Sequence, residues 1–101
     1  MIDTHIFWRL AGEVLLERER QDSMYGRPLY KNGTGSELDA LLLARARSEI
    51  KTLPVTWKLV LNEEVREAFA EKDPKKIRAE LVQVAAVALA WIESLDAGRI
   101  V

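Results

Sequence analysis

Residues 80–92 read ELVQVAAVALAWI, and this stretch decides the fold. Between Leu81 and Ile92 the only polar side chain is Gln83, while alanine and valine fill most of the other positions. At about 100° per residue, these apolar side chains would occupy every side of a helix. We therefore expect a helix that other helices bury nearly all round. The run is too short to cross a membrane, which takes roughly 20 apolar residues.

The chain before this run carries the signals of three further helices. In the first, from about Asp3 to Arg20, apolar residues recur with helical spacing, and the charged run at 17–22 predicts a solvated end. A polar connection over residues 21–36 follows. Its Asn32-Gly33 pair is turn chemistry, because both residues tolerate positive φ.

Capping residues and prolines set the remaining boundaries. Ser36 predicts the N-cap of a second helix that runs to about Thr52, before Pro54. Thr56 predicts the cap of a third helix, from about Trp57 to about Lys72. Asp73 followed by proline is a favoured start for the fourth helix, which would end near residues 97–98. The sequence therefore predicts an all-α, four-helix bundle-like fold, as a single domain over residues 1–101.

Composition narrows the class of protein. The chain has 101 residues, with 15 basic and 16 acidic side chains interspersed and a net charge of −1. A nucleic-acid binder of this size would usually show a basic excess on one face, so we expect no nucleic-acid polymer as partner. There is no cysteine, which excludes disulfides and thiolate metal sites. The N-terminus lacks the pattern of a secretory signal, so we expect a cytoplasmic protein without membrane association.

Acidic residues in the third and fourth helices are the candidate functional groups. Glu63, Glu64 and Glu67 lie on the third predicted helix, with Glu64 and Glu67 bordering its apolar stripe. Glu80 enters the fourth helix at the edge of the apolar run. Since the two helices would fold back about Asp73, Glu67 and Glu80 should lie at similar height. We expect three or four carboxylates to converge between the helices.

Two interpretations of these carboxylates remain open. Clustered carboxylates without histidine or cysteine suit a hard cation, and Mg²⁺ is the usual choice where phosphates complete its shell; Mn²⁺ is the alternative. The other interpretation is a solvated acidic face, because glutamate is common in this chain. In that case the glutamates would pair with the nearby basic residues Arg66, Lys72, Lys75 and Arg78.

A family resemblance favours the first interpretation. Glu63-Glu64-x-x-Glu67 followed by Glu80-x-x-Gln83 resembles the EExxE…ExxD signature of the MazG-like all-α nucleoside triphosphate pyrophosphohydrolase superfamily. The runs AELVQVAAVA at 79–88 and AWIE at 90–93 are similar to segments of short MazG-like proteins of bacteria and their phages. The first half of the chain resembles them more loosely.

The resemblance implies a fold, an assembly and an activity. It implies a helical bundle that forms a homodimer or homotetramer. It also implies Mg²⁺-dependent cleavage of an NTP or dNTP to the monophosphate and pyrophosphate. By the same resemblance Glu63, Glu64, Glu67 and Glu80 are metal-site residues, the first three also catalytic. Gln83 stands where the signature has aspartate, so it offers an amide oxygen and no charge.

Because Gln83 replaces the aspartate of the signature, a second function remains open. A chain without the last carboxylate could be a non-catalytic helical module that binds a nucleotide or a protein partner on the same scaffold. The loop around Tyr25, Gly33 and Gly35 could cover a nucleotide or be a plain surface loop. Trp57 and Trp91 are expected to be core or subunit contacts.

Overall fold

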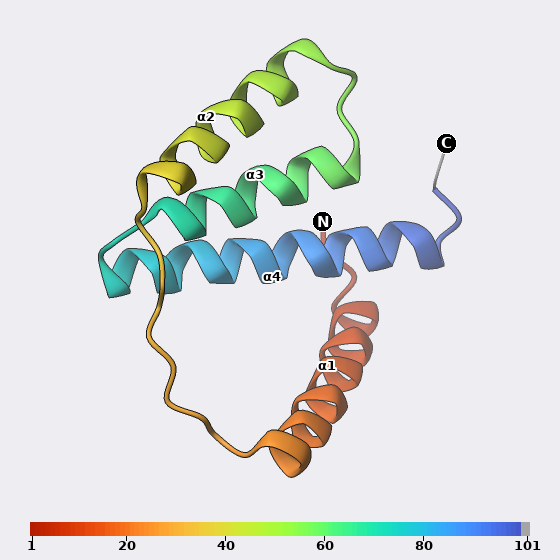
Figure 1. Cartoon of the computed structure of the whole chain (residues 1–101). Helices are drawn as coiled ribbons and strands as arrows, with labels where there is room; N and C mark the ends of the chain where they lie inside the picture. The colour runs from red at the N-terminus through yellow and green to blue at the C-terminus, as the bar shows by residue number, and fades with distance from the viewer. Residues whose placement is uncertain (100–101) are drawn as a thin grey trace. The chain divides into compact units, whose positions relative to one another are not determined.

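Four helices and no strands make up the described part of the chain, residues 1–99, in the computed structural model (Figure 1). The prediction of an all-α fold is confirmed. The helices are α1 (Thr4–Tyr25), α2 (Glu37–Thr52), α3 (Trp57–Ala70) and α4 (Pro74–Asp96).

The helices fall into two compact units. The first unit, residues 1–32, contains α1, and the second begins at Gly33 and contains α2, α3 and α4. In the second unit α3 is the middle helix, packing against α2 on one side and α4 on the other (Figure 1). The prediction of one domain over the whole chain stays a prediction.

The predicted helix starts in the second unit are confirmed. Ser36 caps α2: its hydroxyl accepts the Asp39 N–H at 3.0 Å, and the Asp39 carboxylate accepts the Ser36 N–H at 3.1 Å. This reciprocal pair is a capping box. Thr56 accepts the Leu59 N–H at the start of α3, and Asp73 accepts the Lys75 N–H at the start of α4. Each cap satisfies a backbone N–H that the first turn leaves without a partner.

The predicted end of the first helix was wrong, and the third helix ends two residues before its approximate predicted end. The first helix continues from Arg20 to Tyr25 and ends where Gly26 takes a φ of +65°. The charged run is part of the helix, because Glu17 accepts hydrogen bonds from Arg20 one turn later. The third helix ends at Ala70 rather than residue 72. Its C-cap residue is Glu71, whose carboxylate accepts the backbone N–H groups of Lys72 and Asp73.

The expectation of a fourth helix buried nearly all round was also wrong. Ile77 and Ser94 on α4 are buried, but Leu81, Val82 and Ile92 keep 50%, 56% and 38% of their surface exposed. Within its unit α4 packs against a single neighbour, α3, which covers only one side of it. The apolar pattern of residues 80–92 therefore exceeds what α3 can cover.

The second unit begins with a loop segment fixed to the end of α3. The Gly35 N–H donates to the Phe69 carbonyl at 2.8 Å, and Gly35 has a φ of +86°. A Cβ at this position would run into the Lys72 side chain. Gly35 thus serves both a left-handed backbone conformation and a close approach. Gly33 and Gly35 take the positive φ expected of them, but Asn32 does not, and no turn is present over residues 26–36.

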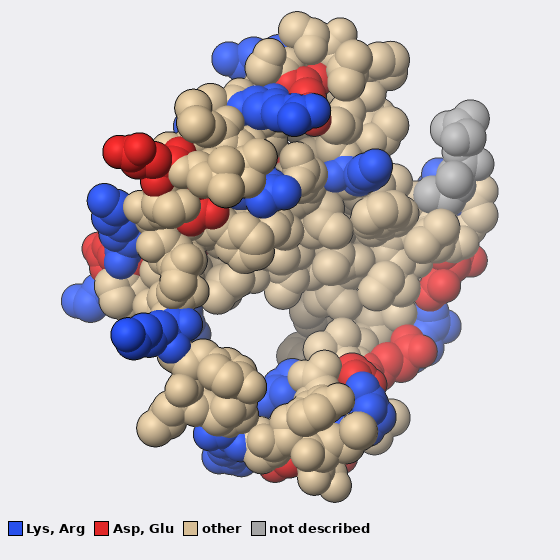
Figure 2. Space-filling model, in the orientation of Figure 1, with Lys and Arg blue, Asp and Glu red and all other residues tan. Residues whose placement is uncertain are grey.

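The surface of this unit mixes the two signs of charge. Basic and acidic side chains are interspersed over the visible face of α2 and α3 (Figure 2). Within residues 1–99, no helix has both the length and the apolar character that crossing a bilayer requires.

Candidate metal centre

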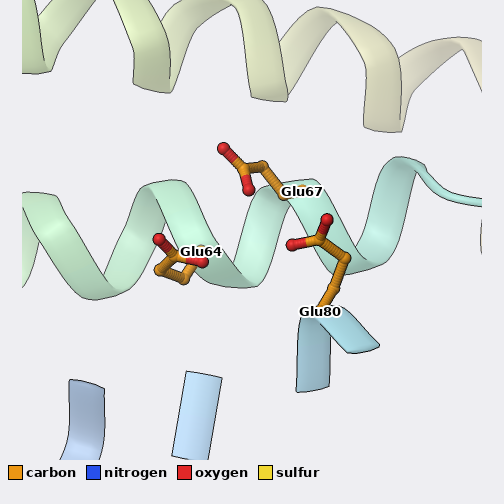
Figure 3. A group of neighbouring side chains, drawn as sticks. All are labelled: Glu64, Glu67 and Glu80. Atoms are coloured by element: carbon orange, nitrogen blue, oxygen red, sulfur yellow. The ribbon is translucent and has the colours of Figure 1, made fainter. Parts of the chain in front are cut away.

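Three glutamates meet where α3 packs on α4. Glu64 and Glu67 are supplied by α3, one turn apart, and Glu80 comes from the second turn of α4 (Figure 3). One carboxylate oxygen from each lies within 4.8 Å of the other two. The acidic cluster expected from the turn at Asp73 is therefore present, and its members come from the predicted positions.

Two oxygens in this cluster are shielded from solvent and have no hydrogen-bond partner. They are Oε2 of Glu64 and Oε2 of Glu80. A buried carboxylate oxygen that accepts nothing has lost its water and gained no donor, which is costly. A bound cation, a proton or an ordered water would remove that cost.

The pKa values of two of these glutamates also indicate that the cluster favours a bound cation or a proton. Burial raises the pKa of Glu64 above its ordinary value, and the charges of Glu67 and Glu63 raise it further. Burial also raises the pKa of Glu67, as do its contact with Glu80 and the charge of Glu63. Both carboxyls thus resist ionisation while no cation is present.

One basic side chain offsets part of this charge. Arg47 on α2 lies 3.8 Å from Oε1 of Glu67, and it lowers the pKa of that carboxyl against the other effects. Figure 3 shows one oxygen of Glu67 on the side of α2 and the other on the side of the Glu64 and Glu80 carboxylates. The basic partners expected from the sequence, Arg66, Lys72, Lys75 and Arg78, did not include Arg47 of α2.

The remaining two predicted site residues lie at the edge of the cluster. Glu63 is half-buried and acts on Glu64 and Glu67 through its charge, but it is outside the group of three converging carboxylates. Gln83 lies one turn after Glu80 on α4, and its side chain is exposed. Their assignment as metal ligands stays a prediction.

The residues present fit a hard divalent cation. The donor set is three carboxylates with no nitrogen or sulfur, which is the set preferred by Mg²⁺, Mn²⁺ and Ca²⁺. Two shielded oxygens have their accepting capacity unused. One arginine opposes three acidic groups, so the cluster can hold two further positive charges.

The alternative interpretation, a solvated and paired acidic face, accounts for little of this. The four cations expected to pair with the glutamates were Arg66, Lys72, Lys75 and Arg78. Among residues 1–99, Arg47 with Glu67 is the only ion pair that reaches the cluster, and Glu64 and Glu80 have none.

No protein-family model, curated protein or solved structure matches this chain. The chemistry of the cluster is therefore the ground on which a function can be proposed.

Proposed function

We propose that the protein is a Mg²⁺-dependent nucleoside triphosphate pyrophosphohydrolase. The observation that carries the proposal is the convergence of Glu64, Glu67 and Glu80 with two shielded oxygens left unpaired. The resemblance of the EEVRE and ExxQ segments to the MazG-like signature supplies the reaction class. The substrate is an NTP or dNTP, and Mn²⁺ is the expected substitute metal.

In this reaction a water oxygen attacks the α phosphorus and the bond from that phosphorus to the bridging oxygen breaks. The products are the nucleoside monophosphate and pyrophosphate. A bound Mg²⁺ would neutralise phosphate charge and lower the pKa of a coordinated water. Glu64, Glu67 and Glu80 would hold the ion, and Glu63 would either join them or orient the water and accept its proton. Arg47 would keep the Glu67 carboxylate in place through charge.

The setting follows from the same proposal. The enzyme would work in the cytoplasm, where its substrates occur, as a homodimer or homotetramer. The exposed apolar side of α4 supports self-association, because an apolar strip of this kind is normally covered.

Pyrophosphate release from each NTP and dNTP, measured with and without Mg²⁺, tests the activity. We expect release from at least one nucleotide, only with Mg²⁺ or Mn²⁺. Glu67→Gln should lower turnover at least a hundredfold while the helical circular dichroism is unchanged. Glu37→Gln, which removes an exposed acid from the first turn of α2, is the matched control. No release from any nucleotide would disprove the proposal.

The non-catalytic module remains the second candidate, favoured by one observation. Gln83 is exposed and brings no charge to the cluster. A thermal-shift screen separates the two functions. Stabilisation by a nucleotide that requires Mg²⁺ favours the enzyme. Stabilisation that is indifferent to Mg²⁺, without pyrophosphate release, favours the module.

A further inference from the structure

A cavity of about 540 Å³ lies between the start of α3 and the end of α4. Its apolar lining comes from Val55, Val60 and the rings of Trp57 and Trp91. We call it the tryptophan cavity. Its volume falls in the range of small-molecule sites, which are mostly apolar with a few polar groups at the edge. All of its lining residues belong to the second unit.

The two tryptophans stack on one another at this cavity. Their rings are nearly parallel, at 10°, and their centroids are 6.5 Å apart. Both side chains are only half-buried, although tryptophan is the largest apolar side chain in the chain. The sequence had suggested core or subunit contacts for them. The structure shows a stacked pair that borders a solvent-accessible space, and a role in subunit contact stays a prediction. Aromatic side chains exposed in this way can also stack on a planar ligand.

The charged side chains that line the cavity are both positive. Lys58 lies in the first turn of α3, and Arg99 follows the end of α4. The N-terminus of α3 adds partial positive charge and the C-terminus of α4 adds partial negative charge, so the two helix ends offset one another and the side chains set the sign. Among the described residues, no acidic side chain lines this space. The rim therefore complements an anion.

The backbone at Arg99 is held in place by the end of α4. Gly98, with a φ of +68°, donates to the Leu95 carbonyl, and the Arg99 N–H donates to the Ser94 carbonyl at 2.9 Å. These two bonds form a Schellman motif. The buried Ser94 hydroxyl in turn donates to the Arg99 carbonyl at 3.2 Å. The N–H and the carbonyl of Arg99 are thus both hydrogen-bonded to Ser94, which holds the Arg99 backbone at the rim.

We propose that the tryptophan cavity is a binding site for a planar aromatic anion. The ring of the ligand would lie against Trp57 and Trp91, and its negative group would face Lys58 and Arg99. No residue that lines the cavity belongs to the glutamate cluster, and Trp57 precedes Glu64 by two helical turns, about 10 Å at 1.5 Å per residue. Binding here therefore requires neither the metal nor the proposed hydrolysis.

Calorimetric titrations in EDTA test this site. The anionic probes are adenosine monophosphate and 2-naphthoate, and uncharged adenosine is the comparison. We expect saturable binding of at least one anion, and weaker binding of adenosine. Lys58→Gln should weaken binding of that anion about three- to tenfold and leave adenosine unchanged. Lys76→Gln, an exposed lysine outside the cavity, should change neither. Glu67→Gln should also leave anion binding intact, which separates this site from the glutamate cluster.

The tryptophans are tested in the same way. Trp57→Leu should weaken binding of every aromatic probe about tenfold, because one stacking face is lost. Trp8→Leu removes an exposed tryptophan of α1 and should have no effect. Lys58 is exposed, so its variant keeps the test valid should Trp57→Leu fail to fold. Absence of saturable binding, equal losses in Lys58→Gln and Lys76→Gln, or binding lost in Glu67→Gln would each overturn the proposal.

Discussion

At the scale of single residues, the raised pKa values of Glu64 and Glu67 make folding sensitive to pH. Each carboxyl has a folded-state pKa above the ordinary 4.5. The stability gained from binding a proton is therefore fully present below about pH 4.5 and is lost as the pH rises through the raised value. A cation that binds the cluster should restore the folding stability that ionisation of these carboxyls removes.

Glu67→Gln should flatten this dependence in the metal-free protein. The amide keeps the shape of the side chain but cannot ionise, so the melting temperature should fall less between pH 4.5 and neutrality than in the wild type. Thermal melts in EDTA across this range measure it, with Glu37→Gln as control. Mg²⁺ should raise the melting temperature of the wild type and not that of Glu67→Gln. Identical slopes in all three proteins would contradict the raised pKa.

Gly35→Ala should destabilise the second unit more than Gly33→Ala does. Both glycines have positive φ, at +86° and +70°, which costs an alanine about 1–2 kcal/mol. Only at Gly35 would the new Cβ also meet the Lys72 side chain. Adding Lys72→Ala should therefore bring the cost of Gly35→Ala down toward that of Gly33→Ala. Denaturant unfolding of the single and double variants measures this, and an unchanged cost would rule out the contact.

The sequence predicted the glutamate cluster but not its arginine. Glu67 and Glu80 stand at similar distances along the chain from Asp73, so a short antiparallel turn brings them together. No comparable spacing along the chain relates Arg47 to the glutamates. Its place opposite Glu67 depends on how α2 packs against α3, and the spacing of apolar residues within either helix does not determine that.

At the scale of helices, local chemistry predicted the starts well and the ends less well. Ser36, Thr56 and Asp73 cap the helices expected of them, because an N-cap is a bond between near neighbours in sequence. The end of a helix depends on whether each further residue continues the helix or leaves it, which no single bond between near neighbours decides. The charged run at 17–22 stays helical, with Arg20 and Gln21 both donating to Glu17 about one turn earlier, and the helix ends only at Gly26.

Asp73→Ala should loosen the start of α4, the helix that carries Glu80. The substitution removes the acceptor of the Lys75 N–H and should cost about 1 kcal/mol of stability. Asp73→Asn keeps an accepting oxygen and should cost clearly less. Denaturant unfolding gives both values, and hydrogen exchange at residues 75–77 shows whether the loss is local. Equal costs for the two variants would mean that the hydrogen bond accepted from the Lys75 N–H is not the source of the stability.

At the scale of the whole molecule, the question raised is what covers the apolar residues of α4 that α3, its neighbour in the second unit, leaves exposed. Leu81, Val82 and Ile92 are each more than a third exposed on a helix whose sequence is apolar on all sides. Periodicity predicted how apolar the helix is, but it could not say whether the covering side chains belong to the same chain. Exposure of this kind marks an interaction surface more often than a bare one.

Self-association through this side of α4 is the resulting prediction. Light scattering at micromolar concentration should give the mass of a dimer or tetramer. Val82→Glu places a charge in the centre of the apolar strip and should weaken association at least tenfold, because a charge buried without a partner is costly. Leu38→Glu makes the same kind of change on α2, at a similarly exposed leucine, and should leave the mass unchanged. A monomer mass for the wild type would show that the strip is not a subunit interface. Equal dissociation by both variants would place the interface elsewhere or spread it over a larger surface than α4 provides.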